Sequence, residues 1–214
     1  MIGTLQRASA VIALAALMLL TGGNALAAPT CDWPDESALE AILPVATDHG
    51  SHASGVVVAP DRVLTAAHAL NGGQQYFVRI GGDFRKARLI MKSSTHDLAV
   101  LEVETDSIKP LPIRLDEPAA SQTVWAVGFP RAQGKTTSSG IFQRNRKGAL
   151  HTSAPIDSGQ SGGGLLSCEH GHYELLGMLR GYGAYLSGDR YVKLQNHSVA
   201  VAATTINQIV GAFQ

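Results

Sequence analysis

The stretch "PIDSGQSGGGLL", Pro155 to Leu166, places four glycines and two serines directly before an apolar run. A flexible surface linker is rich in the same residues, but a linker seldom leads straight into a strand of the core. The other interpretation is a tight backbone turn around the hydroxyl of Ser161, where glycine permits conformations that other residues avoid. The rest of the sequence decides between a linker and a reactive turn.

Strand signals recur along the whole chain. Short runs rich in valine, isoleucine, leucine and aromatic residues alternate with Gly, Pro, Asp and Asn, as in "SGVVVA", "YFVRI", "DLAVLEV", "TVWAVGF" and "SVAVAA". Helical periodicity is confined to "ESALEAIL", residues 36–43, and to residues 204–213, for which Thr204 or Thr205 is the expected cap. Many short strands with turns between them predict an all-β barrel or sandwich. The proline-containing stretch 109–120 is expected to connect two halves.

The first residues match a secretory signal. Arg7 precedes the apolar run Ala10 to Leu20, and "ALAAP" supplies a cleavage site after Ala27. The run is too short to span a bilayer. We therefore expect a signal peptide over 1–27, a mature domain over 28–214, no membrane anchor after cleavage, and export to the periplasm or beyond the cell.

Charge and histidine content exclude several classes of function. The chain has 17 basic and 17 acidic side chains, which gives no reason to expect a nucleic-acid partner. The histidines of "HGSH" and "HGH" lack cysteines or carboxylates at the spacing of a metal site. No metal or cofactor is predicted.

Two cysteines, Cys31 and Cys168, are present in the sequence. An even number in an exported chain predicts one disulfide between them. The alternative is a pair of free thiols.

Three motifs supply residues suited to nucleophilic chemistry. "VLTAAHAL" places His68 just after a strand, "THDLAVLEV" places Asp97 at the start of another, and the opening stretch contains Ser161. A serine hydroxyl needs an adjacent base, and histidine has the pKa for that task near neutrality. A buried aspartate orients the imidazole and stabilises its charged form.

The glycines fit the same chemistry. Acyl transfer passes through an oxyanion, for which backbone N–H groups are preorganised donors. The N–H groups of Gly159 and Ser161 are the expected donors, because a glycine-rich backbone allows both to point the same way.

The motifs "SGVVVAPDRVLTAAHAL", "HDLAVLEV" and "DSGQSGGGLL" together resemble the trypsin-like serine peptidases, in the compact bacterial branch of HtrA-type and glutamyl endopeptidases. The resemblance implies two antiparallel six-stranded β-barrels packed around a central cleft, with a short C-terminal helix. The barrels are expected at about 40–115 and about 118–203, with the helix at 204–213. The resemblance also implies a serine endopeptidase that acts on protein or peptide substrates.

Matching the motifs residue by residue makes His68 the base, Asp97 its orienting partner and Ser161 the nucleophile, with an oxyanion hole at Gly159 and Ser161. Two residues near the nucleophile depart from the family pattern, so the family's substrate specificity is not carried over to this chain. Gln160 stands where the family has Asp or Asn, and Gly164 where it has Pro.

The residues expected at the substrate pocket are Pro155, Arg180, Gly181 and Tyr182. Arg180 would favour an acidic substrate residue from within the pocket, or else it extends into solvent with its aliphatic stem on the surface. The alternative function is a catalytically silent domain of the same fold that binds a protein partner. The oligomeric state is left open.

Overall fold

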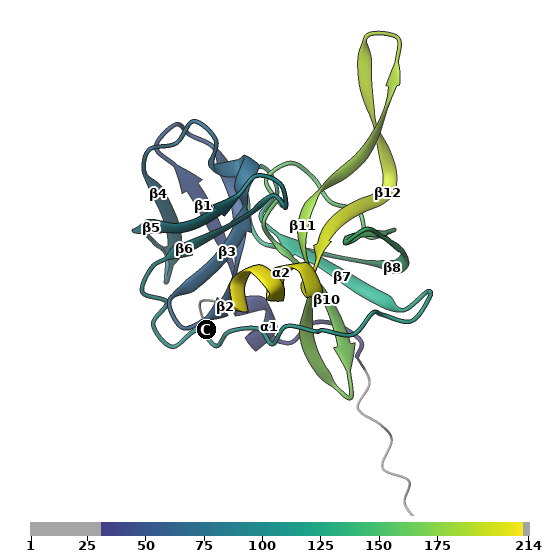
Figure 1. Ribbon diagram of the computed structural model, residues 1–214, viewed down its shortest axis with the longest axis horizontal. Helices are drawn as coiled ribbons and strands as arrows, with labels where there is room; N and C mark the ends of the chain where they lie inside the picture. Colours follow the sequence, from purple (N-terminus) through teal and green to yellow (C-terminus); the bar gives the residue numbers. More distant parts are fainter. Residues whose placement is uncertain (1–30, 212–214) are drawn as a thin grey trace, which may run out of the picture.

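The computed structural model describes residues 31–211, and the predicted signal peptide lies outside them. Two closed antiparallel barrels of six strands each make up this part of the chain (Figure 1). The fold predicted from the sequence, mostly β with a short C-terminal helix, is confirmed.

The first barrel has the strand order β1-β2-β3-β6-β5-β4. Its strands are β1 (Ile42–Thr47), β2 (His52–Ala59), β3 (Arg62–Ala66), β4 (Tyr76–Ile80), β5 (Asp83–Ser93) and β6 (Leu98–Glu102). The 3₁₀ helix η1 (Ala67–Leu70) follows β3 directly. Strands β2, β3 and β6 are almost wholly buried, because they face the interior of the barrel on one side and neighbouring elements on the other.

The second barrel has the strand order β10-β11-β12-β9-β8-β7. Its strands are β7 (Thr123–Gly128), β8 (Thr136–Arg146), β9 (Ala149–Thr152), β10 (Gly164–Glu169), β11 (His172–Ser187) and β12 (Arg190–Ala202). The 3₁₀ helix η2 (Pro130–Ala132) lies between β7 and β8. The helix α2 (Ala203–Val210) continues from β12 and lies between the two barrels in Figure 1.

The larger apolar core joins the two barrels. It contains the interior of the first barrel together with Trp125, Leu166 and Met178 of the second and Ile206 of α2. A smaller cluster fills the second barrel. The barrels are therefore held together by continuous burial of apolar side chains, which is the main favourable contribution to folding.

The connector between β6 and β7 is bonded to both barrels. The N–H of Leu111 donates to Val57 of the first barrel, and Ile113 forms a parallel bridge with Leu175 of the second. The stretch 109–120, predicted to connect two halves, thus has bonded partners in both barrels.

Two local predictions are wrong. The helix expected over 36–43 ends early, because α1 covers Glu36–Glu40 and Ile42 begins β1, where its side chain is fully buried. The expected caps Thr204 and Thr205 lie inside α2, whose N-cap is Ala202 without a side-chain cap. Strand β12 runs directly into the helix, so packing rather than a capping residue sets its start.

The outer parts of β11 and β12 extend beyond the second barrel as a two-stranded ribbon (Figure 1). Residues 184–187 pair only with residues 190–193 within the described chain. This ribbon carries the exposed side chains of Tyr185, Leu186, Tyr191, Val192 and Leu194.

A disulfide joins Cys31 to Cys168 across a sequence separation of 137 residues. It ties the start of the described chain to β10 of the second barrel. No helix within residues 31–211 has the length and hydropathy needed to cross a membrane.

Replacing both cysteines by serine should lower the free energy of unfolding by about 2–4 kcal/mol, because the unfolded chain regains the entropy that the closed loop removes. Urea unfolding monitored by tryptophan fluorescence measures the change. Wild-type protein that has been reduced and alkylated should match the double variant. An unchanged midpoint in both samples would contradict this contribution.

Candidate active site

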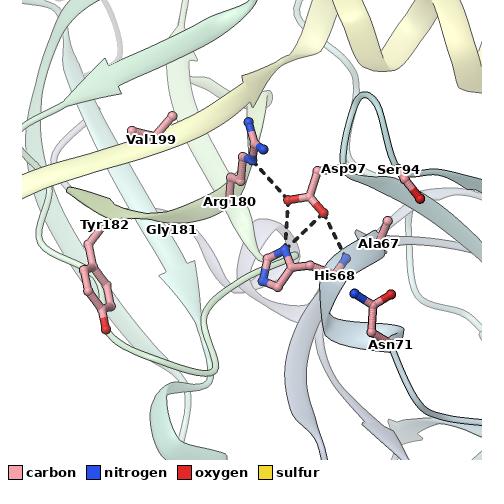
Figure 2. Close-up of a pocket in the computed structure, with 9 residues that line it drawn as sticks. All are labelled: Ala67, His68, Asn71, Ser94, Asp97, Arg180, Gly181, Tyr182 and Val199. Carbon is pink, nitrogen blue, oxygen red and sulfur yellow. Dashed lines mark hydrogen bonds and ion pairs between the residues drawn. The ribbon is translucent and has the colours of Figure 1, made fainter. Parts of the chain in front are cut away.

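A hollow of about 510 Å³ opens between the two barrels. The first barrel contributes His68 and Asn71 from η1 and its flank, and Asp97 from the turn before β6. The second barrel contributes Arg180 and Tyr182 from β11 (Figure 2). Residues far apart in the sequence thus share one cleft.

Asp97 holds His68 by both ring and backbone. Its Oδ2 lies 2.8 Å and its Oδ1 3.0 Å from Nδ1 of His68, and Oδ1 also accepts the His68 backbone N–H at 2.9 Å. With Nδ1–H directed at a carboxylate, the other ring nitrogen, Nε2, lies on the side of the ring away from Asp97 (Figure 2). In a neutral imidazole this arrangement favours the tautomer with its proton on Nδ1, in which Nε2 can accept a proton.

The turn at Asp97 is shaped for this contact. Asp97 adopts a left-handed backbone conformation, with φ at 57°, and its carbonyl accepts the N–H of Ala67. Aspartate is among the residues that tolerate this region best. Only 5% of Asp97 is exposed. Burial alone would raise the pKa of Asp97, but the hydrogen bonds from the His68 ring and backbone, with the charges of His68 and Arg180, hold it below its ordinary value.

The turn around Ser161 requires glycine on both sides. Gly159 and Gly162 have φ of 94° and 88°, and a Cβ on Gly162 would lie 2.1 Å from the carbonyl oxygen of Ser54. A Cβ on Gly159 would lie 2.7 Å from the carbonyl oxygen of Phe129. The glycines are therefore needed for close backbone packing, and the linker interpretation of this stretch does not apply.

Two peptide groups of this turn are held in orientation by hydrogen bonds that their carbonyl oxygens accept. The Ser158 carbonyl accepts the N–H of Arg131 at 2.8 Å, and the Gly159 carbonyl accepts the hydroxyl of Ser54 at 2.9 Å. Within residues 31–211, the N–H groups of Gly159 and Ser161 donate to no other protein group. Two backbone donors close to the serine are thus left available.

The hydroxyl of Ser161 donates to the carbonyl of Arg180 at 3.1 Å. In the described chain no hydrogen bond joins it to His68. The guanidinium of Arg180 reaches the other side of the site, where its Nε lies 3.2 Å from Oδ2 of Asp97. Arg180 therefore contacts both the serine and the aspartate.

Of the residues predicted at the substrate pocket, Arg180, Gly181 and Tyr182 line the hollow. Pro155 is not among the lining residues, and its carbonyl accepts a hydrogen bond from the Ser138 hydroxyl. Gln160 is buried, and its Oε1 accepts the N–H of Asp157. Within residues 31–211 no group of three or more His, Cys, Asp or Glu side chains is arranged to hold a metal.

Ser54 was missed by the sequence reasoning. It is fully buried on β2, and its hydroxyl accepts the N–H of Phe129 while donating to Gly159. Its backbone N–H donates to the carbonyl of Ser161. The signal in the sequence was one small polar residue before a glycine in the apolar strand "ASGVVV", a pattern too common to single out.

A family model described as the trypsin-like peptidase domain matches residues 53–178. The chain belongs to this family. The matched range contains the segments around His68, Asp97 and Ser161 on which the predicted resemblance was based.

Part of the chain is similar to curated proteins named as serine endoproteases. The chain is 31% identical over 127 residues to the serine endoprotease DegS of Haemophilus influenzae, covering 53% of this chain and 37% of that protein. It is 32% identical over 131 residues to a probable periplasmic serine endoprotease DegP-like of Hahella chejuensis, covering 56% of this chain and 28% of that protein. The chain therefore spans about a third of the length of these relatives.

Solved structures share the fold. A serine endoprotease from Yersinia pestis superposes with a TM-score of 0.70 at 24% identity, over 85% of this chain and 67% of that one. The active form of the Rv3671c protease from Mycobacterium tuberculosis gives 0.69 at 17% identity, over 82% and 81%.

Asp97→Asn should lower the free energy of unfolding at pH 7 by about 1–3 kcal/mol, because a buried charged acceptor of several hydrogen bonds is lost. The folded-state pKa of Asp97 lies below its ordinary value of 3.8. The carboxylate therefore stabilises the fold above that pH, and the contribution is lost as the pH falls through the lower folded value. Urea unfolding between pH 3 and pH 7 should show the variant and the wild type converging in acid. Asp189→Asn, at the exposed tip of the ribbon, is the control and should change little at any pH.

Ser54→Ala should lower the free energy of unfolding by about 1–3 kcal/mol, because it leaves the N–H of Phe129 and the carbonyl of Gly159 without their partner. Hydrogen exchange followed by mass spectrometry should show faster exchange in residues 157–163. Ser198→Ala removes a buried hydroxyl that pairs with Thr152 inside the second barrel. The Ser198→Ala variant should lower the free energy of unfolding without faster hydrogen exchange in residues 157–163. Equally faster exchange in both variants would contradict a specific role for Ser54.

Proposed function

We propose that the protein is an exported serine endopeptidase that hydrolyses peptide bonds through an acyl-enzyme intermediate. The observation that carries the proposal is the pairing of His68 with Asp97, which leaves Nε2 of the imidazole directed away from the carboxylate. Both residues line a hollow with Arg180, whose carbonyl accepts the hydroxyl of Ser161. The family match supplies the reaction class.

In the first half of the reaction, the Ser161 hydroxyl exchanges its bond to the Arg180 carbonyl for one to Nε2 of His68. Its oxygen attacks the substrate carbonyl carbon while the proton passes to His68, which acts as general base. The oxyanion that forms accepts hydrogen bonds from the backbone N–H groups of Gly159 and Ser161. The imidazolium then gives its proton to the leaving amine, the C–N bond breaks, and an ester to Ser161 remains.

In the second half, water attacks the ester while His68 takes its proton. Collapse of the second oxyanion returns the proton to Oγ of Ser161 and releases the carboxylic acid. Asp97 holds the imidazole in the required tautomer and stabilises its charged form throughout.

Protein or peptide substrates are proposed from the family and from relatives named as serine endoproteases. Export is proposed from the signal pattern of residues 1–27, from the disulfide and from a relative named as periplasmic. We place the peptidase domain at 28–214, with its barrels at about 40–115 and 118–203. Gly181 and Tyr182 form part of the wall that faces the substrate.

A fluorophosphonate probe, which labels activated serines, should label the wild type, and Ser161→Ala should abolish labelling. Turnover of a denatured protein substrate should fall by about 10⁶ in that variant, as removal of the nucleophile does in a comparable triad. Ser187→Ala, at the exposed end of β11, is the matched control and should label like the wild type. A wild type that resists the probe and binds a protein partner without cleaving it would favour the silent binding domain instead.

A further inference from the structure

Arg180 contacts the candidate triad twice. Its Nε lies 3.2 Å from Oδ2 of Asp97, the oxygen that also lies 2.8 Å from Nδ1 of His68. Its main-chain carbonyl accepts the hydroxyl of Ser161 at 3.1 Å. Figure 2 shows the guanidinium on the opposite side of Asp97 from the imidazole. One residue of the second barrel thus contacts the aspartate of the first barrel with its side chain and the serine with its backbone.

We propose that Arg180 is a positioning residue that holds the Asp97 carboxylate and places a positive charge beside the Asp97–His68 pair. The proposal rests on the proposed function in that His68 is taken as the base. The contact itself, and its effect on protonation, are properties of the folded chain that can be measured without turnover.

Arg180, Asp97 and His68 form one electrostatic group, because Asp97 contacts both of the others. With Arg180 positive, Asp97 negative and the imidazole neutral, the group carries no net charge. Protonating His68 would add a second cation next to a carboxylate that is already paired, and a nearby like charge disfavours the protonated form. Burial raises the pKa of Asp97, and the hydrogen bonds and charge of His68 lower it. The charge of Arg180 lowers it further by a smaller amount.

Within residues 31–211, Asp97 is the carboxylate that forms an ion pair with Arg180. Tyr182 is the other titratable side chain that lines the hollow with His68, Asp97 and Arg180. On the far side of Arg180, a second hollow is lined by His96 and Lys147 and by no acidic residue. Asp97 is therefore the carboxylate on which both His68 and Arg180 depend.

This role differs from that of a specificity residue. The side chain of Arg180 is 53% exposed, so its charge is partly screened, but its Nε is engaged by Asp97 rather than left free for a substrate carboxylate. Replacing Arg180 should therefore change the protonation of His68 even in the absence of substrate.

The test is an NMR titration of the His68 ring in the Ser161→Ala background, with the His68→Gln variant used to assign the signal. Arg180→Gln and Arg180→Met should each move the titration midpoint of His68 up by about one pH unit, because a neighbouring like charge is removed. Arg180→Lys keeps the positive charge and should move the midpoint less than either. The difference should shrink in high salt, where exposed charges are screened.

Arg88→Gln is the matched control, since Arg88 is exposed and pairs with Glu102 of the first barrel. It should leave the midpoint unchanged. A midpoint that does not move in either neutral variant of Arg180, or that moves equally with Arg88→Gln, would overturn the proposal. In the enzyme with Ser161 intact, the acidic limb of the pH–rate profile should shift in the same direction. A wild type that is inert to the serine probe yet shows the NMR shift would refute the proposed function and leave the Arg180 contact standing.

Discussion

Ser54 is the point at which the two barrels meet around the candidate nucleophile. Its N–H donates to Ser161, its hydroxyl bridges Gly159 and Phe129, and its carbonyl accepts the hydroxyl of Thr65. Ser54 and Thr65 are fully buried, so their polar groups have to find partners within the protein. The approach is so close that Gly162 can carry no side chain there. The position of the serine turn is therefore set by the first barrel, although the turn belongs to the second.

Asp97 makes a comparable connection through charge. It lies on the first barrel, where it accepts hydrogen bonds from His68, and it forms an ion pair with Arg180 of the second barrel. A buried carboxylate with this many donors is stable as an anion, and moving either barrel would leave it under-satisfied. Apolar burial holds the barrels together, whereas Ser54 and Asp97 determine how they are aligned.

The sequence was sufficient for the fold and for locating the segments that contain His68, Asp97 and Ser161, because strand periodicity, glycine placement and the residues next to these three are local signals. It was not sufficient where long-range packing decides. Ile42 lies in a segment with a helical pattern, yet it joins a barrel that buries it completely. The contact of Arg180 with Asp97 joins residues from different barrels, and no local pattern distinguishes that arginine from one lying on a surface.

The ribbon of β11 and β12 has a different relation to the fold. Its outer residues pair only with each other in the described chain, while at its base Lys193 lies 3.4 Å from Asp157, beside the serine turn. Such a segment contributes little to the cooperative unit, so it can open without unfolding either barrel. For the same reason, substitutions in these outer residues should disturb the two barrels, and the residues that line the cleft between them, less than substitutions within the barrels do.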